Sequence, residues 1–184
     1  MTIPDPTPYW TAVTPRSDAD RLPRGAVFAF LLAAVLGTLH AIPSAYWAFG
    51  GTLLLETVGQ WAAQAAGGGS LAVTAGLLAL AAAKLAAAWV PLLAQTGRIP
   101  GRRFWRILAW LGGPALLVYG STNALVGSAV LAGWIDSEVV DRQAMMGHAY
   151  IWGPHFALWG LALTGALILS RSASGDPPSA AVGR

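Results

Sequence analysis

The sequence predicts an all-α fold, an integral membrane bundle of four transmembrane helices. Of the 184 residues, 55% are hydrophobic and only 10% are charged, whereas a soluble domain carries about 25% charged residues. The mean hydropathy is +0.57. Four stretches contain no Asp, Glu, Lys or Arg, and each is longer than the roughly 20 residues that cross a bilayer. These stretches are 25–55, 57–83, 107–135 and 143–170.

The first predicted span covers about residues 25–49. It follows a tail, residues 1–24, whose Pro, Asp and Arg content is typical of a disordered segment. A cleaved signal peptide is the alternative, but the apolar run is longer than the hydrophobic region of a signal peptide. We therefore take it as the start of a single transmembrane domain, residues 25–170.

The stretch 50–70 does not fit a further span, because it contains Glu56, two glutamines and a Gly-Gly-Gly-Ser run. A loop that carries a short amphipathic or re-entrant helix fits it better. The second span then covers about residues 71–94, with Lys84 inside it. Its many alanines favour close packing of this helix by small residues.

An arginine-rich loop, residues 95–104, leads to the third span at about 105–132. A polar loop, residues 133–147, separates it from the fourth span at about 148–170. The chain then continues into a tail, residues 171–184, that is rich in Gly, Pro and Ser.

The arginines predict the orientation of the helices. They gather before the first span, around the loop after the second and at the end of the fourth, at positions 16, 21, 24, 98, 102, 103, 106 and 171. The other two loops hold only Arg142. Because cytoplasmic loops carry an excess of Lys and Arg, we expect a multi-pass protein of the cell membrane with both termini in the cytoplasm.

Polar side chains of the four spans fall mainly at one depth. With a rise of about 1.5 Å per residue, positions 40, 119, 123, 148 and 155 lie in the outer half of the bundle and position 84 lies near its middle. Ionisable groups inside a membrane usually face the bundle interior or a wet cavity. The sequence therefore predicts a cavity for a lipophilic small molecule or membrane lipid in the outer half.

Two charged residues allow opposite interpretations. Lys84 is either a structural group, paired with Glu56 or extending its amine toward water, or a substrate anchor whose amine burial holds neutral. Glu56 either faces water at the membrane surface or, if it is buried, serves as a proton donor.

The sequence predicts neither a metal nor a cofactor. There is no cysteine, which excludes thiolate ligands and disulfides. His148 and His155 are seven residues apart, wider than the usual i, i+4 pair, and no carboxylate is fixed beside them. No Walker A, GxSxG or HExxH pattern occurs, and no basic face suits nucleic acid. Oligomerisation stays open.

The nine tryptophans mostly fit the aromatic belts at the two membrane surfaces. Trp159 is the one clearly deep in a span. An aromatic pocket that stabilises positive charge would use Trp159 with Trp47 and Trp152, while the belt explains most of the others.

Two stretches, residues 40–51 and 147–160, resemble a bacterial family of four-span membrane proteins with no assigned function. In that family a His followed by Tyr-Trp-Ala-x-Gly-Gly closes the first span, as His40 and the segment from Tyr46 to Gly51 do here. A Gly-His segment with Trp-Asp-Pro opens the last span. This chain has a longer His-to-Tyr spacing and has Gly153 where the family has Asp. The resemblance implies the fold and no chemistry.

A weaker, class-level likeness is to small integral-membrane terpene cyclases and sterol isomerases, which are similar in size, membrane embedding and residue type. The leading hypothesis is therefore an enzyme that cyclises or isomerises an isoprenoid or other lipid after protonating it. Glu56 would be the general acid, and His40, His148 and His155 would orient it or take the proton back.

In this hypothesis six residues bind the substrate: Trp47, Lys84, Tyr119, Asn123, Trp152 and Trp159. The rival hypothesis is a lipid-binding or accessory membrane protein that performs no chemistry, in which the same residues serve packing. A small transporter is the third alternative, although four spans without an inverted repeat are unusual for one.

Overall fold

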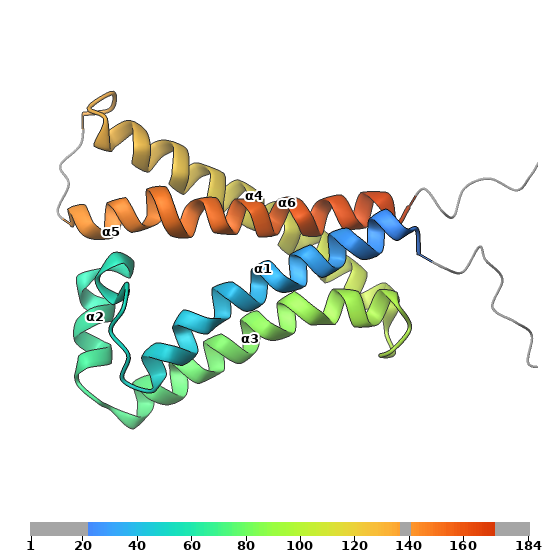
Figure 1. Ribbon diagram of the computed structural model, residues 1–184, viewed down its shortest axis with the longest axis horizontal. Coiled ribbons are helices and arrows are strands. Elements are labelled where there is room, and N and C mark those ends of the chain that lie inside the picture. The colour runs from blue at the N-terminus through green and yellow to red at the C-terminus, as the bar shows by residue number, and fades with distance from the viewer. Residues whose placement is uncertain (1–21, 137–140, 172–184) are drawn as a thin grey trace, which may run out of the picture.

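The computed structural model describes residues 22–136 and 141–171, and every regular element in these ranges is helical (Figure 1). Four segments are long and apolar enough to cross a membrane. They are α1 (Arg24–Ala48), α3 (Leu71–Gln95), α4 (Arg102–Leu131) and the continuous run of α5 (Arg142–Gly147), η3 (His148–Trp152) and α6 (Gly153–Leu169). The predicted all-α class with four such helices is therefore confirmed.

The fourth segment begins earlier than the sequence predicted, at Arg142 rather than at about 148. The reason is a helix cap, because the Asp141 carboxylate accepts a hydrogen bond from the N–H of Ala144 at 2.9 Å. Such a cap satisfies one of the N–H groups that a helix start leaves without a partner. The predicted tails lie outside the described residues, apart from 22–24 and Arg171.

The loop after α1 contains a short 3₁₀ turn, η2 (Leu55–Val58), and an eight-residue helix, α2 (Gln60–Gly67). Gly59 joins them with φ of 120°, a conformation that side chains with a Cβ rarely adopt. The indole N–H of Trp47 donates to the carbonyl of Leu53 at 2.9 Å. The loop is thereby fixed to the end of α1.

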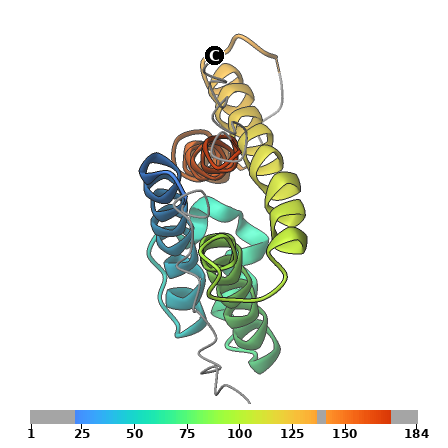
Figure 2. The same cartoon turned by 90° about the vertical axis from the view of Figure 1, so that its right-hand side faces the viewer.

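The long helices form two pairs. In Figure 1, α1 runs beside α3 and α6 runs beside α4, and the largest helix contacts are within these pairs. Figure 2 shows α6 end-on between α1 and α4. The pairs lie close where α1 begins and diverge toward the opposite end, where η2 and α2 lie. That opposite end contains a cavity lined by residues of α1, α2, α3 and the fourth segment.

Glycines allow α4 and α6 to pack closely. Gly113, Gly120 and Gly127 on α4 are buried and spaced seven apart. Gly120 lies against Gly153 of the fourth segment, and Gly113 lies against Gly160. An added Cβ at Gly120 or Gly160 would collide with the backbone of the other helix. Small residues at such positions let helix backbones approach in membranes.

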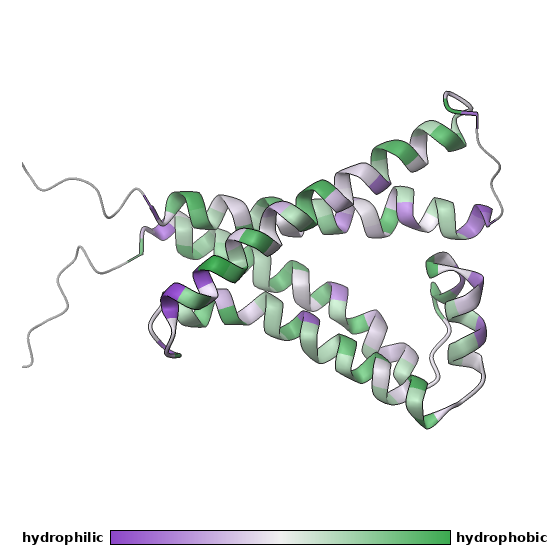
Figure 3. Cartoon of the chain, turned by 180° about the vertical axis from the view of Figure 1, so that it is seen from behind, coloured by the Kyte–Doolittle hydropathy of each residue, from purple (hydrophilic) through white to green (hydrophobic). Residues whose placement is uncertain are grey.

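Apolar side chains cover much of the outside. Val118, Leu125 and Phe28 are 64%, 71% and 69% exposed. Figure 3 shows long apolar stretches along the helices, with hydrophilic residues gathered toward the ends of the bundle. A surface of this kind is expected of helices that face lipid.

Candidate functional site

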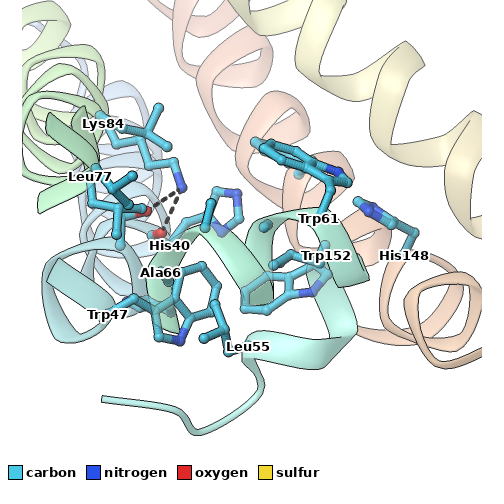
Figure 4. A pocket seen from close by; sticks show the side chains of 17 residues that line it. His40, Trp47, Leu55, Trp61, Ala66, Leu77, Lys84, His148 and Trp152 are labelled. Atoms are coloured by element: carbon cyan, nitrogen blue, oxygen red, sulfur yellow. Dashed lines mark hydrogen bonds between the residues drawn. The ribbon is translucent and has the colours of Figure 1, made fainter. Parts of the chain in front are cut away.

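A cavity of about 270 Å³ lies at the open end of the bundle, and we call it the main cavity because five of the predicted site residues line it. Its walls come from α1, η2, α2, α3 and the fourth segment, so the loop after α1 closes one side (Figure 4). The lining is almost entirely apolar and aromatic. Its polar side chains are His40, Ser44, Lys84 and His148.

Lys84 brings an amine to the apolar wall. Its Nζ donates to the Ser44 hydroxyl at 2.9 Å and lies 3.4 Å from the backbone carbonyl of His40, and Figure 4 draws both bonds. An ammonium has three N–H donors, so one remains for another acceptor. The cavity lining contains no carboxylate. Glu56 is therefore not the partner of Lys84, contrary to the structural alternative considered from the sequence.

His40 is a deeply buried polar group of the wall, with 3% of its surface exposed. Neither ring nitrogen has a hydrogen-bond partner in the structure. A neutral imidazole offers one donor and one acceptor, and a buried polar group without a partner costs about 1–3 kcal/mol. His40 can therefore hydrogen-bond a ligand that enters the cavity.

An aromatic cluster supports the His40 ring from behind. The ring centroid lies 5.1 Å from that of His155, 4.1 Å from Phe156 and 6.2 Å from Trp159. His155 Nε2 donates to the carbonyl of Leu36 at 2.8 Å, since a carbonyl oxygen can only accept. His155 and Trp159 thus hold His40 in place and do not line the cavity themselves.

Two tryptophans form the adjoining part of the wall, and the Trp152 ring centroid lies 5.6 Å from that of His40. Trp47 and Trp152 pack edge to face at 5.8 Å between ring centroids, and they are only 8% and 5% exposed. The Trp152 indole N–H donates to the Thr57 hydroxyl at 3.0 Å. Both rings therefore turn apolar surface toward the cavity, while their N–H groups fix the neighbouring loop.

The π-helical turn η3 separates α5 from α6 and spans His148–Trp152. Such turns are rare in proteins overall, and those that do occur are often at functional sites. Both end residues of this one, His148 and Trp152, line the cavity. The change of helical phase accompanies a contact between Gly147 and the backbone of Thr57, which leaves no room for a side chain at position 147.

The structure does not bring every predicted site residue to this cavity. Glu56 is exposed and lines a separate polar pocket with Gln60, Gln64 and Asp141. Tyr119 is 50% exposed and packs against Phe156. Asn123 donates to the carbonyl of Tyr119 at 2.8 Å. These three groups line a surface and not the main cavity.

A second cavity, of about 290 Å³, lies between α3, α4 and α6. It includes Trp159, Trp105 and Leu163 and has no ionisable side chain in its lining. Metal binding has no support in the described part of the chain, since no group of three or more His, Asp or Glu side chains could hold an ion there.

Ser44, Trp61 and Phe156 are among the cavity residues that sequence reasoning missed. Ser44 lies four residues after His40 and so shares its helix face, a signal that was available. Trp61 was taken as a belt residue, but it closes the α2 side of the cavity (Figure 4). Phe156 follows His155 and carries no chemical signal in the sequence.

A family described as protein of unknown function, DUF3995, has a model that matches residues 37–163. The match includes both stretches on which the sequence resemblance to an uncharacterised family rested, and it confirms that resemblance. Comparison with curated proteins gave no match, and neither did comparison with solved structures.

Proposed function

This chain belongs to the DUF3995 family, and because that family has no assigned function we propose one from the cavity itself. The protein binds a lipophilic small molecule inside the membrane, and the ligand has one polar end that bears oxygen. The binding is non-catalytic in its simplest form. One observation carries this proposal. One N–H of Lys84 and both ring nitrogens of His40 have no hydrogen-bond partner in a cavity with a largely apolar lining.

The chemistry of that pair selects the polar end of the ligand. The third N–H of Lys84 and the ring nitrogens of His40 lack partners, and no carboxylate lines the cavity to balance the amine. A carboxylate, phenolate or carbonyl oxygen would complement both groups. Burying a charge without such a partner is costly, so a ligand of this kind gains from the site.

The walls select the remainder of the ligand. Trp47, Trp61, Trp152 and Phe156 provide apolar ring surface. The volume of about 270 Å³ is near the lower end of small-molecule pockets, which run from about 300 to 1,000 Å³. The cavity therefore suits a polar head with a ring or the first part of a chain.

We extend the proposal to location. The protein lies in the cell membrane, with both termini and the loop between α3 and α4 in the cytoplasm, because the arginines gather at those places. The main cavity then opens in the outer half. Reporter fusions at each loop test this, and a reporter signal from the opposite side for the α3–α4 loop would overturn it.

The binding proposal is tested by identifying the ligand that copurifies with the protein. Lipid extracts of purified wild type are compared by mass spectrometry with those of Ala62→Phe, which fills the main cavity, and of Ala86→Phe, which fills the second cavity. We expect one species that Ala62→Phe loses and Ala86→Phe retains. Equal retention by both variants would overturn the proposal.

Catalysis on the bound lipid is the second candidate. Its support is the free His40 imidazole in an apolar aromatic cavity, an arrangement suited to moving a proton during isomerisation or cyclisation of an isoprenoid. Glu56, the general acid expected from the sequence, is exposed outside this cavity, so His40 would carry the proton instead.

Lipid extracts of producing cells separate the two candidates. An isomer of equal mass and altered retention, present with wild type and Glu56→Gln but absent with His40→Gln, would support catalysis through His40. An isomer that is absent with Glu56→Gln would show that Glu56, and not His40, is the proton donor. Identical extracts from all three would favour binding alone.

A further inference from the structure

A second polar site lies at the other end of the bundle, where α4 begins and α6 ends. We call it the basic pocket, and it has a volume of about 420 Å³. Its lining is Arg102, Arg103, Arg106, Ser170 and Arg171, with no carboxylate among these residues. Figure 3 shows hydrophilic residues gathered at this end. Four guanidinium groups therefore converge on one space.

Buried neutral side chains hold two of these arginines in place. Gln95 and Ser170 are only 5% and 3% exposed. Arg106 donates through Nη1 to Gln95 Oε1 at 3.1 Å and to Ser170 Oγ at 3.0 Å, and through Nη2 to the carbonyl of Leu167 at 3.2 Å. Arg102 Nε donates to the same Gln95 oxygen at 3.1 Å. These acceptors carry no charge.

A third arginine is fixed by an aromatic ring. The guanidinium carbon of Arg171 lies 4.2 Å above the centroid of the Trp110 ring. Arg103 is exposed and completes the lining. The pocket is thus organised by contacts that leave the positive charges of all four arginines without a negative partner among its lining residues.

Orientation of the helices alone does not explain this arrangement. The positive-inside rule requires positive charge in a loop, and Arg98 meets that requirement outside the pocket. It does not require buried Gln95 and Ser170 to aim guanidinium groups at one space. The start of the 30-residue helix α4 adds the positive end of a helix dipole.

We propose that the basic pocket binds a phosphate group, supplied by an anionic lipid headgroup or by a soluble phosphate. Guanidinium groups match phosphate oxygens in paired hydrogen bonds. The Ser170 hydroxyl donates to the carbonyl of Leu167 at 2.9 Å, so the donors offered to the phosphate are guanidinium N–H groups. The site lies at the end of four membrane-length helices, at the depth where lipid headgroups lie.

The test uses the full-length protein in detergent and two probes. Native mass spectrometry measures binding of phosphatidylglycerol, and calorimetry measures binding of inorganic phosphate. The variant is Arg103→Gln with Arg171→Gln, which leaves the contacts of Arg106 with Gln95 intact. The matched controls are Arg98→Gln, at the same end of the bundle, and Ala62→Phe in the main cavity.

We expect the double variant to bind the effective probe about tenfold or more weakly, while both controls stay within about twofold of wild type. Binding of phosphatidylglycerol alone identifies a lipid headgroup as the source, and binding of inorganic phosphate as well identifies a soluble phosphate. Equal weakening by Arg98→Gln, or no binding of either probe to wild type, would overturn the proposal. Because the double variant leaves the main cavity unchanged, its result does not depend on the function proposed for that cavity.

Discussion

Asp141 accepts a hydrogen bond from the backbone N–H of Gln60 at 3.1 Å, although the two residues lie 81 positions apart in the chain. Its other carboxylate oxygen accepts from the N–H of Ala144 at 2.9 Å. One side chain thus serves the first turns of both α2 and α5. Since α2 forms one wall of the main cavity, Asp141 fixes that wall to the fourth membrane-length segment.

Replacement of Asp141 by Ala is expected to lower stability and loosen the cavity wall. Loss of a helix cap costs about 0.5–2 kcal/mol, and here two helix starts lose an acceptor. Unfolding of the variant in mixed micelles, followed by circular dichroism, measures the change. Hydrogen exchange should accelerate in η2 and α2 more than in α1.

The matched control is Asp136→Ala, which removes an exposed acidic residue of the preceding loop. Its stability should stay within about 0.5 kcal/mol of wild type. If both variants unfold alike and exchange in α2 does not change, the two hydrogen bonds of Asp141 do not hold the wall.

Lys84 is the only lysine of the chain, which makes its amine a specific reporter of the main cavity. A lipophilic carboxylate that engages Lys84 should slow its reaction with an amine-reactive reagent, measured by peptide mass spectrometry. We expect at least a tenfold slowing at saturating long-chain fatty acid, because the bound carboxylate then covers Nζ, the atom that reacts with the reagent. The N-terminal amine serves as the internal control.

Lys84→Met should retain the fold and bind the same fatty acid about tenfold or more weakly, since a charge-assisted hydrogen bond contributes about 1.5–3 kcal/mol. An unchanged affinity together with an unchanged labelling rate in wild type would show that the acid binds elsewhere.

The glycine contact between α4 and α6 predicts opposite effects at two positions of one helix. Gly120→Ala forces its Cβ against the backbone of Ala157 and Gly153, so we expect a loss of about 1–3 kcal/mol. Gly112→Ala has open space around it and should gain about 0.5–1 kcal/mol from the better helix former. Unfolding in mixed micelles measures both, and equal effects would contradict the packing account.

The sequence was sufficient for the helices but less informative about which of them pack most closely. Charge-free stretches locate membrane-length helices because a bilayer tolerates few charges. The alanines of the second span pointed to close packing there, and Ala88 does lie against Gly37. Between α4 and α6, however, the two backbones themselves are in contact, at Gly120 and Gly160. The spacing of seven residues between Gly113 and Gly120 indicated this contact in the sequence, since residues seven apart share a helix face.

The candidate site was predictable in depth but not in direction. Depth along a span follows from residue number, and it placed His40 and His148 in the outer half and Lys84 near the middle. The facing direction of a side chain depends on how helices rotate against each other, which left Tyr119 on the surface. Glu56 lies on a loop, where residue number does not give the depth of a side chain in the membrane. Its loop is bonded to Asp141 through Gln60, 81 positions earlier in the chain, and a contact between such distant residues cannot be inferred from the local sequence pattern.

The contact between Trp152 and Thr57 predicts that the loop and the fourth segment stabilise each other. Trp152 Nε1 donates to Thr57 Oγ1 at 3.0 Å, and the Thr57 hydroxyl itself donates to the carbonyl of Leu54. Trp152→Phe and Thr57→Val should each cost about 0.5–1.5 kcal/mol. The double variant should cost less than the sum by about 0.5 kcal/mol or more, because either change alone already breaks the shared bond.

Trp61→Phe is the control, since the Trp61 ring is 77% exposed and its effect should add to that of Thr57→Val. Full additivity in the Trp152 pair as well would mean that this hydrogen bond does not couple η2 to the fourth segment.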